Sequence, residues 1–180
     1  MTPEQESILQ ILYDQSKEVP WSLLIVDALV ENIVNETDRT ESEVRSDLEF
    51  LEEETNGEGP YIIRSSDNGD RDTIKLSSDG MKYILHEDDE DIPEDDQAIL
   101  TVLEEEYEED PSDSWMDVSD LETRASNHGI DIDELNSKVY QLNSLGYVAA
   151  NTRFGGSQSF LYNAAITDEG RRYLTERRLE

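Results

Sequence analysis

Ile166-Thr-Asp-Glu-Gly-Arg-Arg-Tyr-Leu174 decides the fold of this chain, because an equivalent stretch, Leu76-Ser-Ser-Asp-Gly-Met-Lys-Tyr-Ile84, occurs 90 residues earlier (166 − 76). Each stretch is typical of a strand that ends where a helix begins. Thr167 and Ser77 are hydroxyl residues suited to cap the first turn of that helix, and acidic residues follow where the helix dipole favours them. The two stretches therefore predict the same strand-to-helix connection twice.

A glycine recurs in the first turn of both predicted helices, at Gly170 and Gly80. Glycine there costs about 1 kcal/mol of helix stability relative to alanine, so we expect another segment to pack too closely for a Cβ atom. A second match, between Ser7-Ile-Leu-Gln-Ile-Leu12 and Ala98-Ile-Leu-Thr-Val-Leu103, has an offset of 91 (98 − 7). Both ends of one unit recur, which predicts two tandem copies of one domain.

Acidic residues dominate the composition and give a formal net charge of −31 at pH 7. Residues 1–90 carry 24 acidic and 7 basic residues, and residues 91–180 carry 21 and 7. This composition is similar to that of proteins from salt-loving organisms, in which molar salt shortens the Debye length to about 3 Å and screens self-repulsion. The alternative is a dedicated acidic protein, such as a nucleic-acid mimic or a partner of basic proteins. Acids that flank every element favour the halophilic interpretation.

Several function classes are disfavoured by what the sequence lacks. It contains no cysteine, which excludes disulfides, thiol catalysis and zinc ribbons. It has neither a signal sequence nor an apolar run that could span a membrane, so we expect a soluble, cytoplasmic protein. His86 and His128 have no nucleophile at motif spacing, so we expect no enzyme activity, no metal and no cofactor.

The predicted order of elements is the same in both halves, which gives a mainly helical α+β protein. We expect a first domain at 1–86, an acidic linker at 87–94 and a second domain at 95–180. The segment 21–34 carries more apolar residues than one helix face needs, which favours contact with the other half or with a second copy. The first half predicts helices at 4–15, 21–34, 41–54 and 77–85 and strands at 61–64 and 73–76. The second half predicts helices at 95–107, 119–127, 131–145 and from 167, and strands at 147–153 and 159–166.

Three helices, a two-stranded hairpin and a closing helix follow the order of a winged helix-turn-helix domain. The run Leu142-Asn-Ser-Leu-Gly-Tyr147 leads into a hairpin and then into Ile166–Leu174. In this respect the second half resembles the winged-helix transcription regulators and repressor-like proteins of halophilic archaea. The resemblance covers residues 95–175 well and residues 4–85 more loosely. It implies a tandem winged-helix protein whose third helix enters the DNA major groove and whose hairpin contacts the backbone.

The resemblance also implies a set of DNA-contacting residues, because amide side chains read adenine edges and hydroxyl or basic groups reach phosphates. In the second domain the outward side of the third helix and the hairpin provide Asn136, Ser137, Lys138, Tyr140, Gln141, Arg153, Ser157 and Gln158. In the first domain the matching candidates are Arg39, Thr40, Arg45, Arg64, Arg71 and Lys75. Glu49 and Phe50 are poor groove residues, which favours assembly for the first domain. The interface candidates are Trp21, Leu24, Ile25 and Phe50.

The leading hypothesis is a cytoplasmic regulator that binds double-stranded DNA, chiefly through the second domain. The absence of a basic stripe counts against it, because arginines in so acidic a chain can pair with neighbouring acids. One alternative is a winged-helix module that binds a protein partner without contacting DNA, and another is an acidic DNA mimic. We also expect a homodimer formed through the second helix.

Overall fold

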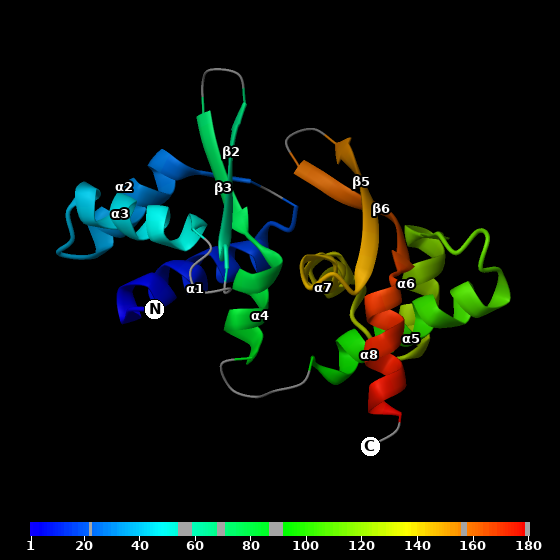
Figure 1. Ribbon diagram of the computed structural model, residues 1–180. Coiled ribbons are helices and arrows are strands. Elements are labelled where there is room, and N and C mark those ends of the chain that lie inside the picture. Colours follow the sequence, from blue (N-terminus) through cyan, green and yellow to red (C-terminus); the bar gives the residue numbers. More distant parts are fainter. Residues whose placement is uncertain (22, 54–58, 68–70, 87–91, 156–157, 179–180) are drawn as a thin grey trace. The chain divides into compact units, whose positions relative to one another are not determined.

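The computed structural model describes residues 1–21, 23–53, 59–67, 71–86, 92–155 and 158–178. The protein is α+β and mainly helical, with two three-stranded antiparallel sheets. It divides into two compact units (Figure 1). Unit 1 consists of Met1–Gln15 and Ser22–Glu87, and unit 2 consists of Ser16–Trp21 and Asp88–Glu180.

The same order of elements occurs in both halves of the chain. The first half contains α1 (Pro3–Glu18), β1 (Leu24–Ile25), α2 (Val26–Glu36), α3 (Glu41–Glu52), β2 (Ile62–Asp67), β3 (Arg71–Leu76) and α4 (Ser78–His86). The second half contains α5 (Glu94–Glu109), β4 (Met116–Asp117), α6 (Val118–Asn127), α7 (Ile132–Ser144), β5 (Val148–Gly155), β6 (Gln158–Ile166) and α8 (Asp168–Arg177). The sheet orders are β1-β3-β2 and β4-β6-β5. Each predicted hairpin therefore has a third, short strand beside it.

The prediction of a single helix over residues 21–34 is wrong. Leu24 and Ile25 form β1, where they lie opposite Ile74 and Thr73 of β3. Because α2 begins only at Val26, the many apolar residues of this segment are divided between two elements, the short strand β1 and the helix α2. The helix keeps an ordinary buried stripe of Val26, Leu29, Val30 and Ile33.

The apolar residues of the third helix in each half recur at spacings of three and four, which predicts one buried stripe, and the structure confirms it. Val44, Leu48 and Leu51 of α3 are each 0% exposed. Thr40 caps α3 through a reciprocal pair of bonds with Glu43, in which each side chain accepts a hydrogen bond from the other residue's backbone N–H. The corresponding stripe of the second half, buried throughout, is Leu135, Val139, Leu142 and Leu145.

The repeated glycine of unit 1 is packed too closely for a Cβ atom, as predicted, and the segment against it is a backbone carbonyl. The Tyr61 carbonyl oxygen, just before β2, accepts a hydrogen bond from the Ser77 N–H at 3.0 Å. A Cβ atom at Gly80 would overlap that same oxygen. The Ser77 hydroxyl donates to the Pro60 carbonyl and accepts from the Gly80 N–H at 2.9 Å. The start of α4 is thereby joined to the start of the hairpin.

Unit 2 repeats this junction with different residues. The Tyr147 carbonyl accepts from the Thr167 N–H at 3.0 Å, and a Cβ atom at Gly170 would overlap the Tyr147 oxygen. The Thr167 hydroxyl donates to the Gly146 carbonyl at 2.7 Å and accepts from the Gly170 N–H at 3.1 Å. In Figure 1 each closing helix, α4 or α8, begins directly where the second strand of its hairpin ends.

A pair of tyrosines covers each junction. The rings of Tyr61 and Tyr83 meet edge to face, with centroids 5.5 Å apart, and those of Tyr147 and Tyr173 stack at 5.0 Å. Tyr83 and Tyr173 each follow the close-packed glycine by three residues, which brings them over the same segment. The recurring Gly-x-x-Tyr spacing therefore reflects one packing arrangement used twice.

The structure also changes the alignment of the two halves around the tryptophans. Each half contains one tryptophan, so the sequence predicts that Trp115 is equivalent to Trp21, but the two are 94 residues apart (115 − 21), whereas β4 begins 92 residues after β1 (116 − 24). Trp115 therefore corresponds to Leu23, which also directly precedes its short strand. Both side chains are exposed, Leu23 by 49% and Trp115 by 41%.

The connection between the halves is described only at its end. Residues 87–91 of the predicted linker lie outside the described residues, as do residues 68–70 and 156–157 of the predicted turns. Ile92 is buried, with 4% of its surface exposed, and its carbonyl accepts a hydrogen bond from the Gln97 side chain at 2.8 Å. Glu94, the last residue of the predicted linker, is the first of α5.

We predict that Gly170→Ala destabilises the protein by about 2–3 kcal/mol, because the new methyl group would be forced against a backbone oxygen that cannot rotate away. Gly129→Ala is the matched control. Its φ is +81°, but nothing lies within 4 Å of the added Cβ, so only about 1 kcal/mol of backbone strain is expected. Urea denaturation in high salt measures both; equal costs would contradict the close packing.

Candidate functional site

The face of α7 predicted to contact DNA is largely buried. Tyr140 is 7% exposed and Gln141 9% exposed, so the expectation that they lie on the outward side of the helix is wrong. Burial also raises the pKa of the Tyr140 phenol, against a smaller opposing effect from Ser144. The buried stripe of α7 is wider than its aliphatic residues alone indicate, because Tyr140 and Gln141 extend it.

Asn136 is already engaged within unit 2. Its side-chain oxygen accepts hydrogen bonds from the Leu161 N–H at 3.3 Å and from the indole N–H of Trp21 at 2.9 Å. Trp21 belongs to the Ser16–Trp21 segment of this unit, and its ring meets Tyr140 edge to face at 5.0 Å. Ser137 is half-buried. Base reading by Asn136 would require it to exchange both of these contacts.

Lys138 lies in a cluster of carboxylates between α5 and α7. Its ammonium nitrogen is 3.4 Å from Asp95, 3.5 Å from Asp96 and 3.6 Å from Glu134. Burial acts to lower the pKa of Lys138, but the carboxylates of Asp96 and Asp95 outweigh it, so the pKa is raised. This lysine is therefore charged and neutralised locally, which leaves little of its charge for a phosphate.

Asp96 is the most deeply buried member of this cluster, with 2% of its surface exposed. Burial raises the pKa of its carboxyl from 3.8 to about 6, although Lys138 acts in the opposite direction. The cluster thus contains a carboxylate that changes charge close to neutral pH.

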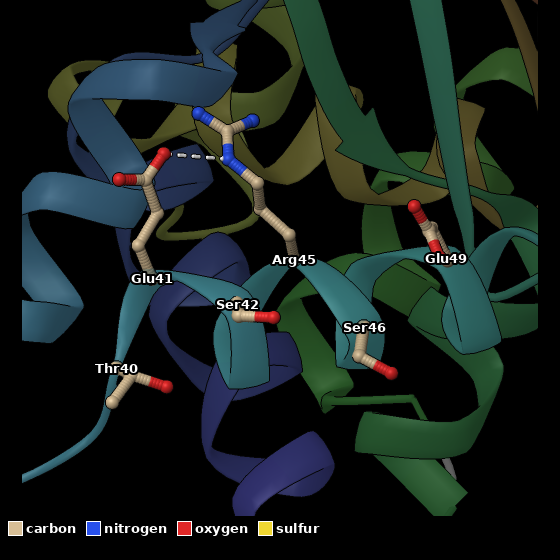
Figure 2. Close-up of a pocket in the computed structure, with 6 residues that line it drawn as sticks. All are labelled: Thr40, Glu41, Ser42, Arg45, Ser46 and Glu49. Carbon is tan, nitrogen blue, oxygen red and sulfur yellow. Dashed lines mark hydrogen bonds and ion pairs between the residues drawn. The ribbon is translucent and has the colours of Figure 1, made fainter.

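The exposed face of α3 in unit 1 is open but contains more acid than base. A shallow hollow of about 720 Å³ lies along it. Arg45, the cation of this hollow, is bound by Glu41 at 2.8 Å (Figure 2). Asp27 of α2 also binds Arg45, at 2.7 Å. Arg39 pairs with Asp47, which also accepts from Gln5 at 3.0 Å. The residues lining the hollow are Thr40, Glu41, Ser42, Arg45, Ser46 and Glu49.

The basic candidates on the two hairpins differ in their surroundings. Arg64 on β2 is 3.5 Å from Glu52, whereas Lys75 on β3 is exposed. Arg153 on β5 is exposed and lies over the ring of Tyr162, 3.3 Å from its centroid. Three further candidates are not placed: Ser157 lies outside the described residues, as do the side chains of Arg71 and Gln158.

The predicted interface residues are only partly exposed. Phe50 is 38% exposed, whereas Trp21, Leu24 and Ile25 are half-buried. Sequence reasoning missed Ile63 and Leu23, which are 42% and 49% exposed. A signal was present in the adjacent apolar pairs Leu23-Leu24 and Ile62-Ile63, because successive strand residues point to opposite faces and only one of each pair can enter the core.

The strand register gathers these missed residues on one surface of the unit 1 sheet. Ile63 lies opposite Lys75 on β3, and Ile25 lies opposite Thr73. Continuing the β1–β3 ladder by one residue places Leu23 beside Lys75 as well. We name this side of the sheet, formed by Leu23, Ile25, Ile63, Thr73 and Lys75, the unit 1 sheet surface.

Two further kinds of site, metal-binding clusters and membrane-spanning helices, are absent from the described residues. They contain no group of three His, Cys, Asp or Glu side chains placed to hold a metal ion. None of the helices they form is long and apolar enough to cross a membrane. No protein-family model matches the chain, and no curated protein matches it in sequence. Its function must therefore be inferred from its own residues.

We predict that the Asp96 carboxyl weakens unit 2 as the pH rises through about 6. The folded state binds the Asp96 proton more tightly than the unfolded chain, because its pKa is raised from 3.8 to about 6. The stabilising contribution is therefore fully present below about pH 4, is lost progressively between about pH 4 and pH 6, and amounts to about 3 kcal/mol in total. Asp96→Asn should remove that dependence and be more stable than the wild type at pH 7.5.

Denaturant unfolding of both proteins from pH 4 to pH 8 measures this effect. Asp95→Asn is the control, because Asp95 also contacts Lys138 but its side chain is 56% exposed. A stability difference between wild type and Asp96→Asn that does not change with pH would contradict the prediction.

Proposed function

We propose that this protein is a non-catalytic tandem winged-helix module that binds a protein partner through the unit 1 sheet surface. The winged-helix assignment is supported by the order of helices, short strand, hairpin and closing helix, which occurs twice. The observation that carries the functional proposal is the exposed aliphatic pair on that surface, Leu23 and Ile63, in a chain with a net charge of −31. Winged helices serve protein assembly as well as DNA binding, so the surface decides between them.

The unit 1 sheet surface has the character of a docking site. Leu23 and Ile63 flank the aliphatic stem of Lys75 in one row across the sheet, and Ile25 lies in the next row. Scattered exposed apolar residues are common, but a contiguous group with polar residues around it is typical of an interaction site. Burying what remains exposed of Leu23 and Ile63 would contribute roughly 1 kcal/mol each.

The charges support a protein partner over a phosphate backbone. Four of the seven basic DNA-contacting candidates are bound to carboxylates, namely Arg39, Arg45, Arg64 and Lys138, whereas Lys75 and Arg153 are exposed. The first turns of both third helices are acidic, with Glu41 and Glu43 in α3 and Asp133 and Glu134 in α7. These turns would meet the phosphates first in a groove-binding pose, and like charges oppose that approach.

We predict that Ile63→Lys and Leu23→Lys each abolish partner binding while leaving the fold intact. Tagged wild-type protein, recovered from its own cells in 1–3 M KCl, should retain a stoichiometric partner or a second copy of the chain, detected by light scattering and mass spectrometry. Ile132→Lys, at an equally exposed apolar position in unit 2 (48%), is the control and should retain binding. A wild-type protein that is monomeric and recovers no partner contradicts this function.

Double-stranded DNA binding is the second candidate, and the open face of α3 favours it. Unlike α7, this helix keeps two serines exposed, Ser42 and Ser46, on either side of Arg45 (Figure 2). Hydroxyl and guanidinium groups can reach phosphates or base edges. In this form the protein is a DNA-binding regulator that uses unit 1, rather than α7 of unit 2, as its reading surface.

Fluorescence anisotropy against pooled genomic duplexes from about 0.5 to 3 M KCl tests this second candidate. If α3 binds DNA, the double change Arg45→Ala and Ser46→Ala should lower the affinity for the duplex at least tenfold. The triple change Asn136→Ala, Tyr140→Ala and Gln141→Ala should lower this affinity only if the buried face of α7 becomes exposed on binding. Absence of duplex binding at every salt concentration would exclude double-stranded DNA binding as the function of the α3 face.

A further inference from the structure

The far end of the unit 2 hairpin presents an arginine and two aromatic rings on one side of the sheet. Arg153 on β5 lies directly opposite Phe160 on β6. Tyr162 follows Phe160 by two residues and therefore points the same way, whereas Leu161 between them is 7% exposed and faces the core. We name Arg153, Phe160 and Tyr162 the distal hairpin surface.

An irregularity in the ladder produces this arrangement. The pairing shifts between Asn151 and Thr152, so that Asn151 lies opposite Asn163 but Thr152 lies opposite Leu161. Tyr162 is therefore the additional residue of a β-bulge. Bulges change the direction of side chains and are common beside functional sites. Here the bulge brings the Tyr162 ring beneath the Arg153 guanidinium.

The charge of Arg153 is not neutralised within the described part of the chain. Its guanidinium carbon is 3.3 Å from the Tyr162 ring centroid, and no described carboxylate forms an ion pair with it. The contrast with Arg64, which pairs with Glu52 on the unit 1 hairpin, is informative because acids outnumber bases 45 to 14. The nearest acid in the ladder, Asp117, lies opposite Asn163, beyond Tyr162. Stacking on Tyr162 leaves the edge of the guanidinium free to donate hydrogen bonds.

Phe160 supplies an aromatic ring that is about half exposed among the described residues. It is 49% exposed, the same fraction as Leu23, although aromatic side chains bury more area than aliphatic ones when they find a partner. The neighbouring amides of Asn151 and Asn163, joined by a hydrogen bond of 2.9 Å, add polar groups to the same side. A ligand with a planar, apolar group and a negative charge close to it could stack on Phe160 and form an ion pair with Arg153.

We propose that the distal hairpin surface binds single-stranded nucleic acid, with an unpaired base stacked on Phe160 and an adjacent phosphate bound by Arg153. Stacking on an exposed aromatic ring is tolerant of sequence and persists when salt screens charges. A duplex hides the faces of its bases, so Phe160 has no equivalent contact there. This site is formed by residues of unit 2 and shares none with the unit 1 sheet surface.

The experiment is anisotropy of a labelled oligothymidylate of 15 nucleotides with the full chain, from 0.2 to 2 M KCl. Phe160→Ala should weaken binding about tenfold, within the range expected for loss of one stacked base. Arg153→Gln should weaken it about fivefold at the lowest salt concentration and flatten the salt dependence, because one phosphate contact contributes a slope of about −0.7. A matching duplex and an oligouridylate are run as parallel arms.

Matched controls separate the site from general effects of charge and hydrophobicity. Arg172→Gln removes an exposed arginine from α8, and Phe50→Ala removes an exposed aromatic ring from α3; both should bind like the wild type. The proposal is overturned if the oligothymidylate does not bind at any salt concentration, if the duplex binds equally well, or if Phe160→Ala and Arg153→Gln behave like the controls.

Discussion

The contact between a backbone carbonyl and a glycine at the start of each closing helix is the constraint on which both units depend. In unit 1 the Tyr61 carbonyl lies against Gly80, and in unit 2 the Tyr147 carbonyl lies against Gly170. The capping hydroxyl of each helix also donates a hydrogen bond to the carbonyl one residue before the tyrosine, that of Pro60 in unit 1 and of Gly146 in unit 2. The start of the helix and the start of the hairpin are therefore held together by several hydrogen bonds. With these ends fixed, the register of the hairpin follows, and with it the side chains that each sheet exposes.

Electrostatics then determine which surfaces remain available. Most arginines and lysines with described surroundings are bound by carboxylates, and the cluster of Lys138, Asp95 and Asp96 is an extreme case because one of its carboxylates is fully buried. What remains is an aliphatic surface in unit 1 and an arginine with two aromatic rings in unit 2. Two copies of one fold thus present different chemistry on comparable faces, which is why the fold alone does not define the function.

Much of the fold could be predicted because its signals are local. The repeated stretches, their hydroxyl caps and the stripes of α3 and α7 depend on residues a few positions apart. The helix predicted over residues 21–34 failed because β1 has only two residues and exists through pairing with β3, about fifty positions away. The α7 site failed for a related reason: polar residues at the edge of a stripe, such as Tyr140 and Gln141, become buried when neighbouring segments cover them.

By itself the sequence determined the duplication, the acidic character, the helical stripes and the need for close packing at Gly80 and Gly170, because each follows from composition or short-range spacing. Only the tertiary structure decided which residue of each adjacent apolar pair faces solvent and which cations are neutralised. It also decided that Arg153 lies over Tyr162 and opposite a half-exposed Phe160. Those outcomes depend on strand register and on contacts between distant segments, which pattern and propensity do not specify.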